Sequence, residues 1–279
     1  MVGIVILNFN NSRRTLDCVK SLREHCPESL WKLCIVDNAS RHEEYAILEE
    51  AFRGEAGISL LRSDENGGYA CGNNLGLKYF EDDTDIDVLL VLNDDTLFTM
   101  DILSPMRDYL LSHEQCGVVC PLVLCPDGSI DHACARRQKS TRDLALQATS
   151  LGKIGVKRSE FIPLEGLRDL PEVHTQVPPG SCMMLRKEVF KQAGYLDPHT
   201  FLYFEEHILC ERLRRLGLGC VLLPQIEIIH IGGATTARQP SKAIYRHWRN
   251  SYLYFMKEYS TVPKPLQWLL KLRTGIKAL

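Results

Sequence analysis

Short runs of apolar residues, separated by segments with helical periodicity, constrain this chain more than any other feature. Val2–Leu7 and Val88–Leu92 are apolar throughout, which is typical of strands that are buried on both faces of a parallel sheet. Between such runs, segments such as Ser12–Cys26 carry apolar residues three apart, as amphipathic helices do. The alternation predicts an α/β fold with a mixed, mostly parallel central sheet, flanking helices and further helices at the C-terminal end.

The same patterns place the individual elements along the chain. We expect strands at Val2–Leu7, Leu33–Val36, Ile58–Leu61, Val88–Leu92, Gly117–Leu124, Ser181–Leu185, Gly219–Leu223 and Glu227–Ile231. We expect helices at Ser12–Cys26, Glu43–Phe52, Gly72–Phe80, Asp101–Ser112, Lys187–Ala193, Glu205–Leu216, Ser241–Tyr259 and Leu266–Leu279. The segment Pro126–Leu170 has mixed polarity and no clear period, so we interpret it as a long excursion from the sheet.

Length and charge narrow the class of protein. A chain of 279 residues can bury a sizeable core, as one large domain or as two closely joined halves. The formal net charge of −2 gives no basic excess, so we expect no nucleic-acid partner. No apolar run reaches the roughly 20 residues that span a bilayer, and Met1 leads directly into the first predicted strand without a signal peptide.

The chain has 11 cysteines, most of them within apolar runs. Free, buried cysteines are typical of a reducing compartment, so we expect a cytoplasmic protein. The alternative is a zinc site built from Cys116, Cys120, Cys125, His132 and Cys134. The sequence contains no Cys-x-x-Cys pair, which argues against such a zinc site.

Polar residues gather where four of the predicted strands end. The clusters are Asn8–Asn10, Asp37–Ser40, Asp64–Gly68 and Asn93–Thr96. In an open parallel sheet, the loops at the carboxyl ends of the strands form the ligand-binding crevice. The four clusters therefore predict a binding site along one edge of the sheet.

The adjacent carboxylates Asp94 and Asp95 give the sharpest of these signals. Two carboxylates at a strand end repel each other unless a cation or hydrogen-bond donors compensate them. A divalent cation held by one or two carboxylates and by substrate phosphates is a common use of such a pair. A solvated turn is the alternative, because Asn and Asp are frequent in turns.

Asp37 and the glycine-rich segment Asn66–Asn74 suggest contacts with a nucleotide. Asp37 could accept hydrogen bonds from a ribose or a base, while Asn38 or Ser40 caps the next helix. The segment Asn66–Asn74 opens a predicted helix, whose N–H groups could bind an anion. It matches neither the Walker A nor the dinucleotide-binding pattern, and its first two residues alone are compatible with a plain turn.

Two further features lie in the second half of the chain. Glu205 and Glu206 follow an aromatic-rich segment at the start of a predicted helix, where a carboxylate beside apolar rings can act as a general base. The helix dipole is the alternative reason for acidic residues there, and Arg212 on the same helix could orient a carboxylate. His230 ends a predicted strand before two glycines, so it is either a core residue or a contact for a metal or phosphate.

In this order and spacing, the motifs resemble those of the family 2 inverting glycosyltransferases, and most closely the rhamnosyltransferase-like members that build bacterial surface polysaccharides. The segments that carry the resemblance are IVILNFN (Ile4–Asn10), IVDNAS (Ile35–Ser40), ENGGYACGNNLG (Glu65–Gly76), LLVLNDDT (Leu89–Thr96), PGSCMMLRKEVFKQAGYLD (Pro179–Asp197), FLYFEEHILCERLRRLG (Phe201–Gly217), PQIEIIHIGGAT (Pro224–Thr235) and YRHWRNSYLYFMKEY (Tyr245–Tyr259). The resemblance implies a GT-A fold, a nucleotide-diphosphate sugar donor such as dTDP-rhamnose or a UDP-sugar, and Mg²⁺ or Mn²⁺.

The resemblance also implies roles for individual residues. Glu206 stands at the position of the catalytic base, with Glu205 as the alternative, and Asp95 and His230 stand at the metal site. Nucleotide-sugar contacts are expected from Asn8, Asn10, Asp37, Asn66, Gly68, Asn73, Asn93 and Asp94. Acceptor contacts are expected from Gly180, Tyr203, Trp248 and Arg249.

Two positions depart from the family pattern. Asn93 replaces the first acidic residue of the metal motif, and Ile208 stands where a further acidic residue is usual. The second departure leaves a non-catalytic carbohydrate-binding or scaffold protein as an alternative function. A nucleotidyltransferase, which also uses strand-end carboxylates and a metal, is another alternative.

We divide the chain into a GT-A catalytic domain at residues 1–235 and a C-terminal helical extension at residues 236–279. Within the first, residues 1–120 form the nucleotide-sugar-binding half and residues 121–235 the acceptor and catalytic half. The extension ends in a basic amphipathic tail from Lys264, which either packs on the core or lies on an anionic membrane surface. The expected partners are a nucleotide-diphosphate sugar, a glycan or lipid-linked acceptor and the inner face of the cytoplasmic membrane.

Overall fold

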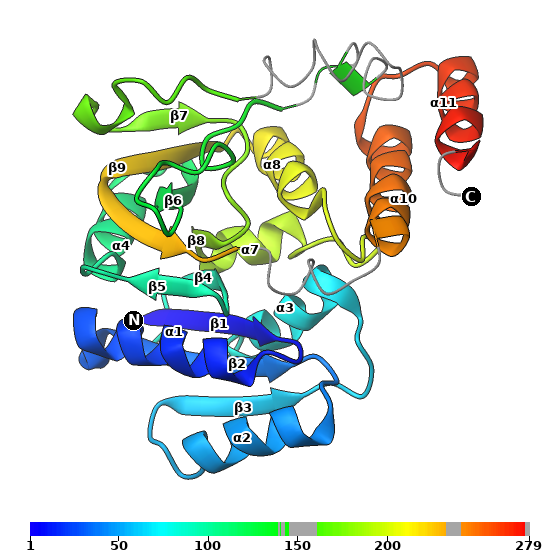
Figure 1. The fold of residues 1–279 in the computed structure, drawn as a ribbon. Helices are drawn as coiled ribbons and strands as arrows, with labels where there is room; N and C mark the ends of the chain where they lie inside the picture. Colours follow the sequence, from blue (N-terminus) through cyan, green and yellow to red (C-terminus); the bar gives the residue numbers. More distant parts are fainter. Residues whose placement is uncertain (139, 141–142, 145–160, 233–240, 277–279) are drawn as a thin grey trace.

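One mixed β-sheet forms the centre of the molecule, as the computed structural model shows for the part of the chain that it describes (Figure 1). The described residues are 1–138, 140, 143–144, 161–232 and 241–276. Within these ranges the strands run in the order β3-β2-β1-β4-β8-β6-β9-β5, and β7 pairs with β9. Their bounds are β1 (Val2–Asn8), β2 (Trp31–Asp37), β3 (Ile58–Arg62), β4 (Val88–Asn93), β5 (Thr96–Phe98), β6 (Cys116–Leu124), β7 (Val173–Thr175), β8 (Cys182–Arg186) and β9 (Gly219–His230).

The N-terminal strands of the sheet are parallel. β1 pairs in parallel with both β2 and β4, and β2 pairs in parallel with β3. β8 then enters between β4 and β6 and is antiparallel to both. Residues in the middle of these strands, such as Val5, Ile35 and Leu90, have no solvent exposure, as the continuous apolar runs predicted. The α/β class with a mixed central sheet is therefore confirmed.

Helices cover both faces of this sheet (Figure 1). One apolar core lies between the sheet and the helices α1 (Ser12–His25), α2 (His42–Phe52) and α4 (Leu103–Ser112). A second core lies on the other face, under α3 (Gly68–Tyr79), α7 (Lys187–Ala193) and α8 (Glu205–Arg215). Two short 3-10 turns, at Glu28–Leu30 and Leu167–Asp169, complete this part of the molecule.

The strand β9 differs from the prediction of two separate strands. It runs without a break from Gly219 to His230, and its pairing with β6 shifts between Pro121 and Leu122. Pro121 lies opposite Leu223, but Leu122 lies opposite Glu227, so the residues between them on β9 bulge from the ladder. Pro224 lies in this bulge, where its missing N–H costs no ladder hydrogen bond.

Two helices at the C-terminal end pack beside the sheet domain, α10 (Ser241–Tyr259) and α11 (Lys264–Ile276) (Figure 1). A third apolar cluster joins them to α8 through residues such as Ile208, Tyr252 and Leu270. Within the described ranges, no helix combines the length and the apolar character needed to cross a bilayer. The proposed boundary at residue 235 stays a prediction, since residues 233–240 lie outside the described part, as do the last three residues of the tail.

The glycine-rich segment is placed differently from the sequence expectation. α3 begins at Gly68 and not at Gly72, so the second glycine of the segment is the first residue of the helix. Gly68 has a φ of +81°, and a Cβ atom there would lie 2.3 Å from the carbonyl oxygen of Phe201. The backbone N–H of Tyr69 donates to that same oxygen at 2.8 Å. The glycine therefore lets α3 approach the chain that precedes α8.

Substitution of Gly68 by alanine tests this contact. Gly68→Ala should lower the free energy of unfolding by about 2–4 kcal/mol, because it adds a backbone collision to the strain of a left-handed conformation. Gly57 is a matched control, since its φ is +77° and a Cβ atom there would meet no atom within 4 Å. Gly57→Ala should cost only about 1 kcal/mol in urea unfolding. Equal losses for the two variants would contradict the contact with Phe201.

Candidate active site

The polar ends of the parallel strands lie at the same edge of the sheet. Asn8 at the end of β1 is level with Asp37 at the end of β2, and Leu7 is level with Asn93 at the end of β4. The N–H of Asn93 donates to the carbonyl of Ser181 at 2.9 Å, just before antiparallel β8 begins. The edge therefore combines the ends of the parallel strands with the start of β8.

Asp37 is fully buried and lies in a dense hydrogen-bond network. Its two oxygens accept from Asn8 Nδ2 at 2.8 Å and from the N–H of Ser40 at 3.1 Å, and Arg62 Nε lies 3.6 Å away. Ser40 Oγ in turn accepts from Asn8 Nδ2 and from the N–H of Asn10. The expectation that Asn38 or Ser40 caps the next helix is wrong, because α2 follows Arg41 without a side-chain cap. Ser40 instead accepts hydrogen bonds from Asn8 and Asn10, and Asn38 bonds to Asn66 and Gly67.

Asparagine side chains fix the start of α3 at this edge. Asn38 Nδ2 donates to Asn66 Oδ1 at 2.9 Å, and Asn38 Oδ1 accepts from the N–H of Gly67 at 3.2 Å. Asn66 Oδ1 also accepts from the N–H of Gly68 at 3.0 Å. With the bond from Tyr69 to Phe201, the first N–H groups of α3 have partners within the chain. These contacts involve the N–H groups of Gly67, Gly68 and Tyr69, and an anion contact at this helix N-terminus stays a prediction.

Asn73 and Asn10 complete the residues assigned to the nucleotide-sugar. Asn73 is fully buried, its Nδ2 donates to the carbonyl of Tyr69 at 2.9 Å, and its Oδ1 has no partner among the described residues. Asn10 has a φ of +53° and its Oδ1 accepts from the N–H of Arg41 at 2.8 Å. The contacts of these residues with a nucleotide stay predictions.

Asp95 and His230 are brought together by the pairing of two strands. β5 is antiparallel to β9 with Thr96 opposite His230, and His230 Nε2 lies 3.0 Å from Asp95 Oδ1. Asn93 Nδ2 is 3.4 Å from the same imidazole nitrogen. Asp94 faces a different partner, because its Oδ2 accepts from Asn11 Nδ2 at 3.1 Å. Both carboxylates are 7% exposed.

Burial and mutual repulsion dominate the electrostatics of this group. Burial, and then the charge of Asp95, raise the pKa of Asp94 to about 7, although Asn11 and Arg14 oppose the shift. Burial lowers the pKa of His230, but its hydrogen bond and charge interaction with Asp95 outweigh burial, so the net pKa is raised. Sequence reasoning missed Asn11 and Arg14, although Asn11 directly follows the first polar cluster.

These residues suit a divalent cation. Among the described residues, no three His, Cys, Asp or Glu side chains converge as a preformed metal site. Asp95 and His230 would offer one oxygen and one nitrogen ligand, and a cation would relieve the repulsion that raises the pKa of Asp94. Mg²⁺ and Mn²⁺ commonly take few protein ligands and complete their coordination with water and substrate phosphates. The donor set therefore fits a cation that arrives with a diphosphate.

The two glutamates at the start of α8 follow a strained backbone. Tyr203 and Phe204 each have a φ of +73°, which non-glycine residues adopt only when their surroundings compensate the cost. Glu205 is 2% exposed, and its Oε1 has no hydrogen-bond partner in the described part. Burial and then the charge of Glu206 raise the pKa of Glu205 to about 8.

Glu206 lies beside the start of β8. A Cβ atom on Gly180 would lie 2.2 Å from Glu206 Oε1, so the carboxylate keeps this position only because residue 180 is a glycine. Arg136 Nη2 is 3.8 Å from the same oxygen and donates to the carbonyl of Pro178 at 2.9 Å. The hydroxyl of Tyr69 donates to the carbonyl of Gly180 at 2.5 Å. Sequence reasoning missed Arg136 and Tyr69, because neither contact follows from spacing along the chain.

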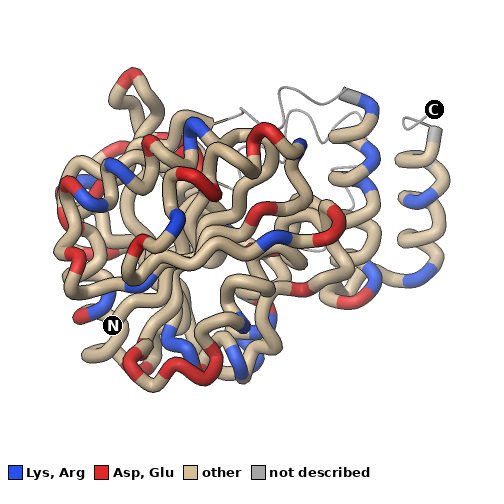
Figure 2. Tube along the Cα trace, turned by 90° about the horizontal axis from the view of Figure 1, so that it is seen from below, with Lys and Arg blue, Asp and Glu red and all other residues tan. Residues whose placement is uncertain are grey.

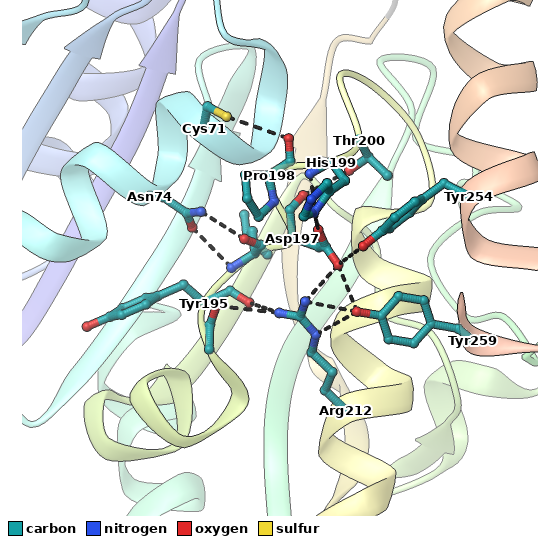
Figure 3. Close-up of polar contacts among 12 residues, drawn as sticks. Cys71, Asn74, Tyr195, Asp197, Pro198, His199, Thr200, Arg212, Tyr254 and Tyr259 are labelled. Atoms are coloured by element: carbon teal, nitrogen blue, oxygen red, sulfur yellow. Dashed lines mark hydrogen bonds and ion pairs between the residues drawn. The ribbon is translucent and has the colours of Figure 1, made fainter. Parts of the chain in front are cut away.

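A buried carboxylate anchors the segment before the glutamates (Figure 3). Asp197 Oδ2 accepts from Arg212 Nη2 at 2.7 Å and from the hydroxyls of Tyr254 and Tyr259 at 3.0 and 2.7 Å. Asp197 Oδ1 lies 2.8 Å from His199 Nδ1. Burial alone would raise the pKa of Asp197. The hydrogen bonds to its two oxygens outweigh burial and lower the pKa to about 2. Arg212 was expected to orient a carboxylate, and the carboxylate is Asp197, which joins α8 to α10.

Helix α10 packs directly on the strained segment. The rings of Phe201 and His247 stack with centroids 4.3 Å apart, and Ser251 Oγ donates to the carbonyl of Leu202 at 2.9 Å. Phe204 is buried against α10, and its ring lies 5.3 Å from that of Phe255. These contacts compensate the backbone strain before Glu205.

Ile208 and the two acceptor candidates on α10 lie in or near the same apolar cluster. Ile208, where the family usually has an acidic residue, is fully buried in this cluster and does not face the sheet edge. Trp248 stacks on Tyr252 with ring centroids 5.1 Å apart. Arg249 contacts α11, because its Nε donates to Thr274 Oγ1 at 3.3 Å. It makes no ion pair with the glutamates among the described residues, and its acceptor role stays a prediction.

Known sequences resemble the chain over most of its length. The sequence pattern of the family described as Glycosyl transferase family 2 matches residues 3–194. The chain is 25% identical to the low-salt glycan biosynthesis hexosyltransferase Agl10 of Haloferax volcanii, over 90% of this chain and 74% of the relative. It is 22% identical to the rhamnosyltransferase WbbL of Escherichia coli K12, over 92% and 94%. It is 27% identical to an N-acetylglucosaminyl-diphospho-decaprenol L-rhamnosyltransferase of Mycobacterium tuberculosis, over 66% and 60%.

Solved structures show the same fold. GalNAc-T7 with UDP, GalNAc and Mn²⁺ superposes with a TM-score of 0.65 at 13% identity, over 99% of this chain and 54% of GalNAc-T7. The mannosyltransferase PcManGT from Pyrobaculum calidifontis, with GDP-Man and Mn²⁺, gives 0.61 at 13% identity, over 99% and 73%. The chain spans little more than half of GalNAc-T7. At this identity the likeness concerns the fold, and it confirms the predicted GT-A architecture.

The raised pKa of Glu205 predicts a dependence of stability on pH. The folded protein holds this proton up to about pH 8, whereas an unfolded glutamate loses it near pH 4, so the Glu205 contribution to stability falls as pH rises between them. Glu205→Gln removes that loss. We expect the variant to exceed the parent at pH 8 by about 2–4 kcal/mol in urea unfolding, with the difference vanishing near pH 4.

Glu211 on the same helix is the matched control for this experiment. Its hydrogen bonds with Arg214, and then the neighbouring charges, lower the pKa of Glu211 despite its partial burial. Its ionised form therefore stabilises the fold above the pKa of an unfolded glutamate, and Glu211→Gln should lower stability at pH 8. A Glu205→Gln variant that is less stable than the parent at pH 8 would contradict a protonated, buried Glu205.

Proposed function

The chain belongs to glycosyltransferase family 2, and from this premise we propose that it transfers a sugar from a nucleotide-diphosphate donor to a hydroxyl of a glycan or lipid-linked acceptor, with inversion at the anomeric carbon. A role in glycan or polysaccharide synthesis agrees with the names of its relatives, which include a hexosyltransferase and two rhamnosyltransferases. One observation carries the proposal: the carboxylates of Asp94 and Asp95 directly follow β4, and the carboxylate of Glu206, at the start of α8, lies beside Gly180 just before the neighbouring strand β8. The bond from Asn93 to Ser181 and the contact of Gly180 with Glu206 link the two groups.

Glu206 is the better general base of the two glutamates. Its side chain is 18% exposed and lies beside Gly180, just before β8, so an acceptor hydroxyl can approach it. Glu205 is buried, and its raised pKa keeps it protonated at neutral pH, where a base must be ionised. In this assignment Glu206 takes the proton of the acceptor hydroxyl as its oxygen attacks the anomeric carbon. Arg136 holds the carboxylate in place.

The part of the sheet edge that contains Asp94, Asp95 and His230 suits the diphosphate of a donor. Asp95 and His230 would hold Mn²⁺ or Mg²⁺, and a cation of this kind neutralises charge on the departing nucleoside diphosphate. The guanidinium of Arg14 lies near Asp94, and its buried Nη1 has no partner in the described part, so it can face a phosphate. The neighbouring structures that contain Mn²⁺ with UDP or GDP-Man support this assignment.

The nucleoside belongs at the ends of β1 and β2 in this proposal. Asn8, Asn10 and Asp37 form one network there, and Asn66 and Asn38 continue it toward α3. These side chains hold the edge in shape even without a ligand, because nearly all their polar atoms have partners. Their role is to preorganise the donor site, which limits the ordering cost of binding.

Replacement of the proposed base gives the sharpest test. Glu206→Gln should lower kcat by about 10²–10⁴-fold and leave the dissociation constant of the nucleotide-sugar unchanged, because proton removal is lost while the donor edge is intact. The assay is release of nucleoside diphosphate with saturating acceptor. Glu205→Gln is the matched control and should keep most of kcat. The reverse pattern, with an active Glu206→Gln enzyme and an inactive Glu205→Gln enzyme, would exchange the two roles.

Neighbouring carboxylates provide a matched pair for the metal assignment. Asp95→Asn should weaken donor binding in the presence of Mn²⁺ by at least about tenfold in calorimetry, because it removes a ligand. Asp94→Asn, one residue away, should have the smaller effect, since its carboxylate is hydrogen-bonded to Asn11 and not to His230. If Asp95→Asn binds the donor as the parent does and responds equally to Mn²⁺, Asp95 is not a ligand.

A further inference from the structure

Positive charge is concentrated at the C-terminal end of the chain. Residues 241–279 contain eight lysines and arginines and one glutamate, a net charge of +7. Residues 1–240 contain 25 basic and 34 acidic residues, a net charge of −9. Figure 2 shows basic positions along both C-terminal helices, whereas acidic and basic positions alternate over the rest of the molecule. The small net charge of the whole chain is therefore the sum of a basic C-terminal segment and an acidic remainder.

One face of α11 packs on the protein and the other is exposed. Leu270 and Thr274, four residues apart, are 2% exposed and face α10, where Thr274 Oγ1 accepts from Arg249. On the opposite side, Trp268, Leu269 and Leu272 are 65%, 55% and 48% exposed. These are the largest exposures among the bulky apolar residues of the described chain, apart from Tyr79 at 49%.

Basic and apolar side chains share this exposed face. Lys264, Trp268, Lys271 and Leu272 follow the four- and three-residue spacing that places side chains on one side of a helix. Lys264 and Lys271 are exposed, and neither forms an ion pair with an acidic residue of the described part. The face thus presents tryptophan and leucine between two lysines.

We infer that α10 and α11 together form a docking surface for an anionic lipid bilayer. Tryptophan and leucine can enter the interfacial region while lysine reaches the headgroups, which is the pattern of helices that lie on membranes. Each lysine or arginine near an anionic leaflet adds a favourable electrostatic contribution. A symmetric contact with a second copy would bring two segments of net charge +7 together, which the charge disfavours.

Docking at this surface would bring the bilayer close to the candidate active site. α10 contacts the segment before Glu205 through the Phe201–His247 stack and the bond from Ser251 to Leu202. In Figure 1 both helices lie on the side of the sheet toward which the arrow of β1 points. This last step rests on the proposed function, since a lipid-held acceptor would then reach Glu206 from the membrane. The docking itself does not depend on catalysis.

Vesicle flotation of the full chain tests the inference without an activity assay. The protein should float with vesicles of phosphatidylcholine and phosphatidylglycerol, and should stay unbound with phosphatidylcholine alone. Binding should fall steeply as salt is raised, because the lysines contribute through charge. Equal flotation with both vesicles, or with neither, would overturn the inference.

Variants on the exposed face give the quantitative test. Neutralisation of Lys264 and Lys271 to glutamine should lower vesicle partitioning about fivefold per lysine, and Trp268→Ser should lower it further. The control carries Lys20→Gln and Leu111→Ser, which alter an exposed lysine on α1 and a 46% exposed leucine on α4. The control should float like the parent. Equal loss in the control would show non-specific adsorption and would overturn the docking surface.

Two further outcomes separate lipid from other occupants. Trp268 should give a blue-shifted fluorescence on addition of anionic vesicles, and the shift should be lost in Trp268→Tyr, since Trp31 is buried and Trp248 stacks on Tyr252 against the third apolar cluster. Sedimentation should give a monomer in the absence of lipid. A dimer that is broken by Trp268→Ser would assign the face to a second copy. Salt-sensitive binding of RNA with no binding to vesicles would assign it to a nucleic acid. Either result would overturn the lipid assignment.

Discussion

The insertion of antiparallel β8 beside β4 is the constraint on which the candidate site depends. Because β8 starts where β4 ends, Ser181 accepts a hydrogen bond from Asn93, and the adjacent Gly180 lies against Glu206. A parallel strand in this place would start at the opposite edge of the sheet. The chain that leads into β8 would then be remote from the carboxylates that follow β4. Strand direction thus brings Asp94 and Asp95, which follow β4, close to the segment that contacts Glu206.

Buried carboxylates around this edge are compensated in different ways. Asp197 is held ionised by a dense set of donors, and Asp37 accepts hydrogen bonds from Asn8 and Ser40, whereas burial raises the pKa of Asp94 and that of Glu205. Asp94 and Asp95 repel each other despite their bonds with Asn11 and His230, so a cation would gain most here by replacing repulsion with attraction. Glu205, with no donor for Oε1, is relieved by a proton. The buried carboxyl side chains around this edge are therefore of three kinds: a pair suited to a cation, the ionised anchor Asp197 and the protonated Glu205.

The sequence predicted the features that are local, and missed those that depend on distant pairing. Continuous apolar runs indicated the parallel strands, and the order of polar clusters indicated the edge where Asp94 and Asp95 lie. The short strand β5 was missed because its three residues pair only with β9, and the bulge at Pro224 divided β9 into two apparent strands. The capping role assigned to Ser40 failed because Asn8 and Asn10, 32 and 30 residues away in sequence, donate hydrogen bonds to its hydroxyl. No local pattern encodes such partners.

The anchoring of Asp197 ties the C-terminal helix α10 to the segment that leads to the two glutamates. One carboxylate oxygen receives bonds from Arg212 of α8 and from Tyr254 and Tyr259 of α10, while the backbone that follows Asp197 leads to Tyr203 and Glu205. The fold therefore has no dispensable tail at this point. Chimeras that exchange α10 between relatives must transfer both phenolic hydroxyls with it, or supply substitutes, if the glutamates are to keep their orientation.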